Sequence, residues 1–547
     1  MRDPKCFVRR AGLTAAALAL SVFVFEADVV RAQTSSGLSA AAAAAPAEAQ
    51  GPVRRLSIEE AVALALEQNI NLQVDRIDPQ VSDLAISVAR SGWTPAVFSN
   101  VQTQQQTNPA TDVFGGATTI TNENITSQAG IQQQLPWGGA NYTLFWNNRR
   151  ATTNNIFSSF NPQLSSTLGL NFTQPLLRNF TIDATRQQVL VSRKNREISD
   201  VQLQQSISAT IRNVKNAYWD LVFAINNLAV QRQSLDLAQQ SYRDNRARVE
   251  IGTMAPLDIV QAEAEVAQRE EAVILAEAAI RRQEDTLRAL ISNPVDQNDF
   301  WTMRIEPSDS ADFQPIAVDV DGAVRAALAN RTDLSASRKQ LENNDIAIRF
   351  FRNQSMPDVN AVVNYSAFGI AGTQFQLTNE FPPQRGAETR RGFGGALGDI
   401  FAADYPTWSV QLQVNYPIGA STADANLARA RLQDSQARKQ LQASELQVTT
   451  QIRDLARTVT TNGQRVESTR AARALAEKRL EAEQKKFTAG MTSSFFVTQA
   501  QRDLADARNR ELRAIIDYLK SVIDFETAQQ SPLAGGGGGI APIVQQQ

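Results

Sequence analysis

The sequence predicts an α+β protein built from two internal repeats, in which two-faced β-strands are followed by very long helices. The first observation is a duplication, because residues 56–95 recur at 318–357 with a constant offset of 262 positions. A second pair of segments aligns Gly252 with Gly490 at an offset of 238 positions. A repeat this long exceeds the ~20–50-residue period of solenoids and favours a pseudo-symmetric assembly over a stacked array.

Composition narrows the possible functions. The 547 residues include no histidine, and Cys6 is the only cysteine. The chain therefore lacks the commonest general base and the commonest transition-metal ligand, and it cannot form an internal disulfide. Carboxylate or Ser-Lys catalysis stays open, but nothing indicates a compact pocket, so we expect no enzyme activity, no cofactor and no metal site. A net charge of −2 creates no field that attracts nucleic acid, which we exclude as a partner.

The N-terminus has the pattern of a secretory signal peptide. Basic residues precede an apolar run at 11–25, and Val30-Arg31-Ala32 is a small-residue cleavage site before Gln33. This run is shorter than the roughly 20 apolar residues that a membrane-spanning helix needs. No later stretch is a candidate for such a helix, so we expect the chain to meet a bilayer again only as a β-barrel.

Period-two alternation predicts strands in both halves. Tyr142, Leu144 and Trp146 alternate with polar residues, and residues 409–416 follow the same pattern. Strand pattern alone fits a soluble sandwich as well as an outer-membrane barrel, whose strands of about 9–11 residues are apolar toward lipid and polar toward the lumen. The predicted signal peptide indicates that the chain is secreted, and this favours the outer-membrane barrel over the soluble sandwich. The Gly-, Thr- and Asn-rich segments 108–123 and 370–404 are then the expected external loops.

Long helices follow the strands in each half. Residues 183–250 contain no proline, and their apolar residues recur at steps of four and three, as in a coiled-coil seam; residues 422–487 repeat this pattern. Each helix should be roughly 100 Å long at 1.5 Å per residue. A turn with one glycine, Gly252 or Gly490, suits the left-handed conformation that ends many helices, and Pro256 can begin the returning helix. A filamentous coiled coil would explain these hairpins but not the strands.

Taken together, these motifs resemble the TolC family of outer-membrane efflux and secretion ducts. The resemblance covers residues 56–529 and rests on AxxxALxxN-like opening helices, QPLL at Gln174, the RxxxG and KxxxG tips and the ordered duplication. It implies a trimeric outer-membrane β-barrel, in contact with lipid, that continues into a long periplasmic α-helical barrel. It also implies a periplasmic adaptor protein and an inner-membrane pump as partners. The pump must supply the energy, since the chain has no GxxxxGK[ST] phosphate loop.

The expected function is the exit duct of a tripartite efflux or type I secretion system, a passive conduit of the cell outer membrane that projects into the periplasm. The alternative is a secreted structural coiled-coil protein. The predicted segments, in chain order, are a signal peptide (1–32), a flexible leader (33–55), an upper helix (56–95), barrel strands (96–175), a helical hairpin (176–292), an equatorial linker (293–317), and then the second upper helix (318–357), barrel strands (358–417), helical hairpin (418–530) and a disordered tail (531–547).

The resemblance places a closed aperture near the hairpin tips, where the family has acidic residues six and nine positions after the tip glycine. In this chain the first tip has Asp258 and Gln261 at these positions, and the second has Phe496 and Gln499. The second tip therefore departs from the family's acidic constriction. Phe496 either forms an apolar gate that opposes wetting or packs between helices.

The same tips are the expected docking surface for the adaptor. Arg248 and Lys486 lie four residues before each glycine, where they either meet the adaptor or place positive charge near a helix C-terminus, an effect worth ~0.3–1 kcal/mol. Met254 and Thr492 stand where the family has a locking arginine, so a latch here must use other residues. The predicted docking residues are Arg248, Gly252, Met254, Lys486, Gly490 and Thr492.

One departure concerns the strands of the first half. Extra strand pattern occurs at 129–135 and 142–146, joined by Pro136-Trp137-Gly138-Gly139. The second half has room for only two strands, and the family barrel uses four strands per protomer. The added hairpin either lengthens existing strands, folds outside the barrel or enlarges it.

Overall fold

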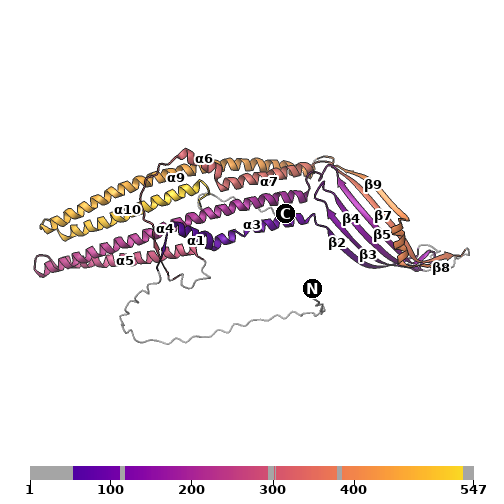
Figure 1. The fold of residues 1–547 in the computed structure, drawn as a ribbon, viewed down its shortest axis with the longest axis horizontal. Helices are drawn as coiled ribbons and strands as arrows, with labels where there is room; N and C mark the ends of the chain where they lie inside the picture. Colours follow the sequence, from indigo (N-terminus) through magenta and orange to yellow (C-terminus); the bar gives the residue numbers. More distant parts are fainter. Residues whose placement is uncertain are drawn as a thin grey trace, which may run out of the picture. The chain divides into compact units, whose positions relative to one another are not determined.

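A computed structural model describes residues 53–110, 118–292, 301, 303–378, 385–419 and 421–533. Figure 1 shows long helices lying side by side and a sheet of tilted strands that follows them. The predicted signal peptide (1–32), nearly all of the predicted leader, and residues 534–547 of the predicted tail lie outside the described residues.

The two repeats have the same order of helices. In the first repeat the upper helices are α1 (Ile58–Gln68), α2 (Ile70–Asp75) and α3 (Asp78–Ser91), and the hairpin consists of α4 (Ala184–Glu250) and α5 (Pro256–Ile291). In the second repeat the upper helices are α6 (Val320–Asn330) and α7 (Thr332–Gln354), and the hairpin consists of α9 (Thr422–Thr488) and α10 (Ser494–Ala528). Both long helices, α4 and α9, contain 67 residues, so the duplication read from the sequence is present in the fold.

Local sequence explains where the helices begin. Ser57 and Glu60 form a reciprocal capping box at the start of α1, which satisfies two backbone N–H groups that the helix leaves free. The Asp183 carboxylate accepts a hydrogen bond from the Arg186 N–H at the start of α4. Pro256 occupies the first position of α5, where its missing N–H costs nothing.

The strands of both repeats form one antiparallel sheet. It contains β2 (Ala96–Pro109), β3 (Thr119–Gln134), β4 (Asn141–Thr153), β5 (Phe160–Pro175), β7 (Asp358–Leu377), β8 (Arg385–Arg391) and β9 (Tyr405–Asn415). The long strands lie in the order β2-β3-β4-β5-β7-β9, and β8 pairs with the far end of β7. The added hairpin therefore lies within the sheet, because β3 and β4 separate β2 from β5.

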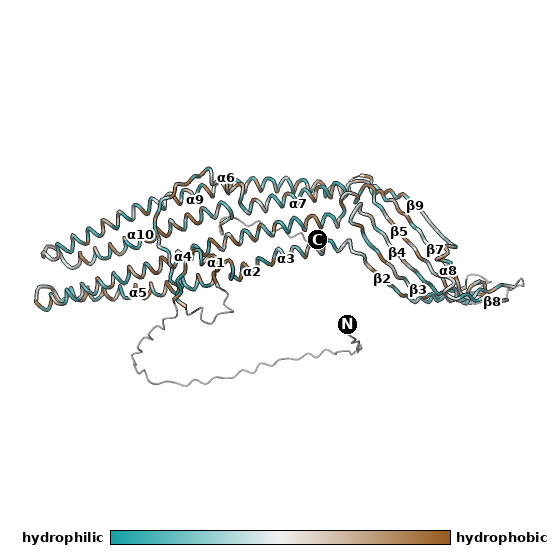
Figure 2. Tube along the Cα trace, in the orientation of Figure 1, coloured by the Kyte–Doolittle hydropathy of each residue, from teal (hydrophilic) through white to brown (hydrophobic). Residues whose placement is uncertain are grey.

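One face of this sheet is apolar. Hydrophilic and hydrophobic residues alternate along the strands in Figure 2. Successive strand pairings place six apolar residues opposite one another in a single row across all six long strands, and each of them is exposed in the single chain. The row consists of Val97, Ile131, Leu144, Leu170, Tyr365 and Trp408.

A short helix, α8 (Phe393–Ala402), packs on β7 and β5. It crosses Gly369, which lies on the same face as Tyr365; a Cβ added at Gly369 would lie 1.9 Å from the Ala396 carbonyl oxygen. This corrects the predicted loop at 370–404, where β7 continues to Leu377 and β8 and α8 follow. The loop predicted at 108–123 is also too long, since residues 119–123 already belong to β3. Cross-strand pairing and burial of Ala396 order segments whose composition indicated loops.

The upper helices pack on the long hairpins around a second, small sheet. β1 (Val53–Leu56) pairs in parallel with β6 (Arg304–Pro307), so the predicted leader ends before residue 53 and the predicted linker contains a strand. Tyr218 of α4 is fully buried here, and its hydroxyl donates to the Asp309 carboxylate at 2.6 Å and also lies 3.0 Å from the Leu56 carbonyl oxygen. Ser531 is also fully buried, so the ordered chain extends past the predicted start of the tail.

Candidate functional site at the hairpin tips

The two tips have the same backbone geometry. Gly252 and Gly490 have φ values of +76° and +73°, the left-handed conformation that the sequence predicted. In the first tip the Thr253 N–H donates to the Arg248 carbonyl at 2.9 Å, and in the second the Met491 N–H donates to the Lys486 carbonyl at 2.9 Å. These bonds satisfy carbonyl groups that a helix C-terminus leaves free, so each chain reversal is fixed by the same local chemistry.

The two basic residues before the glycines have different surroundings. The Arg248 guanidinium lies 4.4 Å from the centre of the Phe487 ring, which belongs to the other hairpin. Lys486 forms an ion pair with Glu483 at 2.8 Å within its own helix. Arg248 therefore joins the two tips, a contact that neither sequence interpretation of this residue included. The Lys486 ion pair lies within α9, and the docking role of Lys486 stays a prediction.

The predicted aperture residues lie on the first turns of α5 and α10. Asp258 is in the first turn of α5, where a negative charge is favourable, and Gln261 is exposed. Phe496 is 52 % exposed and contacts Phe495 edge to face, with 5.6 Å between the ring centres. In the single chain, Phe496 therefore does not pack between helices. The Gln499 side chain donates to Asp503 at 2.9 Å.

Met254 and Thr492 lie in the tip turns and are partly buried. Phe495 was not singled out by sequence reasoning, although it directly precedes Phe496. It is 56 % exposed, so the start of α10 presents two aromatic rings that the described residues leave about half exposed. A pair of adjacent phenylalanines after a polar turn was the sequence signal for this apolar patch.

An ion pair between the hairpins is the main element that the sequence did not reveal. The Glu265 side chain, in α5, is only 5 % exposed. It accepts hydrogen bonds from the Arg502 Nε of α10 at 2.8 Å and from the Arg269 Nε of its own helix at 2.7 Å. Burial by itself raises the pKa of Glu265, but the hydrogen bonds from Arg502 and Arg269 outweigh burial, and the pKa is lowered below its ordinary value. Glu265 therefore stays ionised and ties α5 to α10.

Further polar contacts join the hairpins away from the tips. They connect α4 of the first hairpin to α10 of the second: Gln501 to Ser241 at 3.2 Å, Arg508 to Gln233 at 2.6 Å, Lys520 to Asp220 at 2.7 Å and Arg212 to Asp524 at 2.5 Å. Among the ion pairs between the hairpins in the described residues, the Glu265–Arg502 pair lies nearest to the tips, so it is the ion pair best placed to resist separation of the tips.

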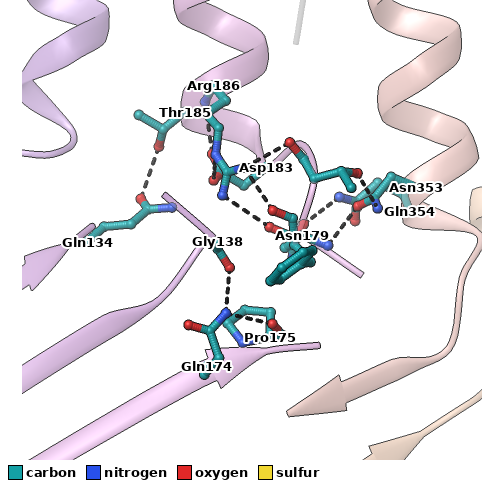
Figure 3. A network of polar contacts seen from close by, with 12 residues as sticks. Gln134, Gly138, Gln174, Pro175, Asn179, Asp183, Thr185, Arg186, Asn353 and Gln354 are labelled. Atoms are coloured by element: carbon teal, nitrogen blue, oxygen red, sulfur yellow. Dashed lines mark hydrogen bonds and ion pairs between the residues drawn. The ribbon is translucent and has the colours of Figure 1, made fainter. Parts of the chain in front are cut away.

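At the opposite end of the hairpins, a polar network fixes the sheet to the helices (Figure 3). Gln174, the first residue of the QPLL motif, donates to the Gly138 carbonyl at 2.8 Å. The Asn179 backbone N–H donates to the Asn353 side chain at 2.6 Å, which connects the first repeat to α7 of the second. Gly139 has a φ of +68°, and a Cβ there would lie 2.3 Å from the Asn179 carbonyl oxygen, so only glycine fits this turn.

No group of three or more potential metal-ligating side chains occurs in the part of the chain that the structure describes. In the same residues, every helix is too short or too polar to span a membrane.

A sheet with an exposed apolar row, joined to two long helical hairpins, is typical of outer-membrane channel proteins with a helical extension. The model of the family described as outer membrane efflux protein matches residues 61–293 and 323–528. The chain belongs to this family. It is therefore a channel protein of the outer membrane and a passive conduit rather than an enzyme, and the structural coiled-coil alternative is wrong.

Solved structures share the fold of this chain. The chain is similar to CusC, with 14% identity and a TM-score of 0.62 over 87% of this chain and 92% of that one. The CmeC outer membrane channel of Campylobacter jejuni has 16% identity and a TM-score of 0.58 over 86% of this chain and 85% of that one. The open state of the Neisseria gonorrhoeae MtrE channel has 13% identity and a TM-score of 0.57 over 87% and 89%. The predicted fold class is confirmed. No curated protein sequence matches the chain.

Proposed function

We propose that three copies of this chain form the outer-membrane exit duct of a tripartite efflux or type I secretion system. The observation that carries this proposal is the apolar row across the sheet, combined with two sheet edges, β2 and β9, that pair with one strand each in the described residues. A sheet in a bilayer must close on itself, because unpaired backbone groups in lipid cost several kcal/mol each. Pairing of β2 with β9 of the next copy closes it.

The added hairpin makes this barrel wider than the four-strand protomer pattern would. The order β2-β3-β4-β5-β7-β9 places six long strands side by side, so three copies (3 × 6) would supply 18 strands. Barrels of about 16–18 strands leave an aqueous channel. The sheet therefore favours an open outer-membrane end, with the narrowest part of the duct at the hairpin tips.

At the tips, two features would restrict the duct. Phe495 and Phe496 of three copies would bring six aromatic rings together, and an apolar constriction opposes wetting. The Glu265–Arg502 ion pair would hold α5 against α10 while the aperture is narrow. A periplasmic adaptor that binds the tips, around Gly252, Met254, Gly490 and Thr492, would open the aperture by separating the hairpins. An inner-membrane pump would supply the energy.

Cross-linking tests the closure of the barrel. Apart from Cys6, which the predicted signal peptide removes, the chain has no cysteine, so single cysteines can be placed freely on β2 and β9. We expect a variant with one cysteine on each edge strand to give covalent trimers on oxidation at matching depths, while variants with a cysteine on only one strand do not. Monomers alone at every depth tested would contradict closure between copies.

Planar-bilayer recording tests the conduit. The purified protein should give small, steady single-channel steps that grow when Phe496 is replaced by alanine. Absence of conductance from inserted protein, both for the wild type and for Phe496→Ala, would refute the duct.

A further inference from the structure

A cavity of about 490 Å³ lies where α4 and α7 meet the sheet. The first turns of α4, the last turns of α7, and the turns before β2 and after β3 line it. Packing at the sheet end places two upper helices and two hairpin helices in the order α3, α4, α7, α9, so α4 and α7 are the central pair and both are flanked by helices of the same chain. The cavity therefore belongs to one protomer and does not lie at the edges through which copies would meet.

Four arginines and no acidic residue line this cavity. Arg186 is neutralised by Asp183, with 2.8 Å between Nε and the carboxylate. Arg193, Arg349 and Arg352 form no ion pair with any described residue and are exposed. Three uncompensated guanidinium groups around one cavity repel one another, and an anion bound among them would remove that repulsion.

A second polar group at the cavity has no partner. The Nε1–H of Trp93 is buried and donates to no described atom. A buried donor without an acceptor carries a desolvation cost that a bound acceptor would remove. Arginine forks bind phosphate with two parallel hydrogen bonds, and a phosphate oxygen is also an acceptor for an indole N–H.

The rest of the lining is mostly apolar. Ile182, Val189, Leu190 and Met356 contribute carbon surface beside the arginines. A free inorganic anion has no apolar part to bury against such surface. An amphiphile can place its phosphate on the arginines and its hydrocarbon on these side chains.

The cavity also lies at the depth of lipid headgroups. Pro136, which lines it, follows the last residue of β3 by two positions, and the apolar row reaches Ile131 of the same strand. The Trp93 carbonyl accepts a hydrogen bond from Gln133 at 2.8 Å, which fixes Trp93 at this end of the sheet. The boundary between the apolar band and the helices is thus the membrane surface on the hairpin side, and basic pockets at such surfaces bind anionic lipid headgroups.

We propose that Arg193, Arg349, Arg352 and the Trp93 N–H bind the phosphate of an anionic phospholipid from the leaflet that faces the hairpins. Its acyl chain lies against the apolar side of the cavity. The lipid fastens the sheet end of the hairpins to the membrane, beside the polar network that Asn179 and Asn353 form. The proposal requires the outer-membrane location of the family but neither the adaptor nor the pump.

Native mass spectrometry of the purified full-length protein tests this directly. The protein is equilibrated in detergent with equal amounts of phosphatidylglycerol and phosphatidylethanolamine, and the retained lipids are counted. We expect wild-type protein to retain phosphatidylglycerol preferentially, and the triple variant Arg193→Gln, Arg349→Gln, Arg352→Gln to lose about tenfold or more of that preference. Replacement of the same three residues by lysine should keep part of it, since charge remains while the fork geometry is lost.

A control variant carries Arg325→Gln, Arg431→Gln and Arg510→Gln, which change the charge equally at exposed positions outside the cavity. It should retain the wild-type preference. Equal retention of both lipids by the wild type would overturn the proposal, and this readout requires no variant to fold. Two other results would also overturn it. One is a loss of the phosphatidylglycerol preference in the control variant equal to the loss in the triple variant. The other is that added inorganic phosphate binds the wild-type protein and abolishes its lipid retention, which would assign the site to a free anion.

Discussion

Replacing Arg502 with glutamine should loosen the hairpin tips. The change removes the only ion pair that joins α5 to α10 among the described residues, while Glu265 keeps Arg269 as a partner at 2.7 Å. Glu265 is thus not left as an uncompensated buried charge. The measured effect therefore reports the bond between the hairpins rather than the cost of a buried orphan carboxylate.

The expected magnitude follows from the geometry. A hydrogen bond to a charged group contributes ~1.5–3 kcal/mol. The Arg502 side chain is 41% exposed, so solvent screening reduces this contribution to about 1–2 kcal/mol. Since 1.4 kcal/mol corresponds to a factor of ten, Arg502→Gln should raise the ratio of open to closed channels by about 5- to 30-fold.

Single-channel recording in planar bilayers measures this ratio. Arg510→Gln, on the same helix but exposed, is the matched control and should behave as the wild type. The wild type should also open more as the pH falls. Because the pKa of Glu265 is lowered in the folded protein, its ion pair contributes above the ordinary glutamate pKa and is lost as the pH falls through the lowered value. An unchanged open fraction in Arg502→Gln, with the trimer intact, would refute the reasoning.

Three further predictions concern packing. Gly490→Ala should cost ~1–2 kcal/mol locally, because alanine is strained at a φ of +73° although no atom lies nearby, and hydrogen exchange of the tip should accelerate. Gly369→Val should displace α8 from the Ala396 contact and expose α8 to proteases; unchanged protection would contradict that packing. Burial and the hydrogen bond to Asp309 raise the pKa of Tyr218 to about 12. The protonated Tyr218 hydroxyl therefore contributes fully to folding stability below the ordinary tyrosine pKa, and this contribution is lost as the pH rises toward 12. Tyr218→Phe should flatten this alkaline part of the stability profile measured by thermal melting.

Local signals in the sequence determined the repeats, the long helices and the tips. The spacing of apolar residues over a few turns specifies a helix, and a glycine with a positive φ specifies where it ends, so α4, α9, Gly252 and Gly490 could be predicted from neighbouring residues alone. The docking role of the tip residues stays a prediction, because it depends on a partner.

Only the tertiary structure decided which surfaces meet. Glu265 and Arg502 are 237 positions apart, and no local rule brings them together. Three other features also depend on contacts between segments far apart in the sequence. They are the place of β3 and β4 inside the sheet, the packing of α8 over Gly369, and the convergence of Arg193, Arg349 and Arg352 on one cavity. Helix and strand periodicity are fixed by backbone geometry within a few residues, whereas the choice of contacting faces depends on burial and charge summed over the whole chain.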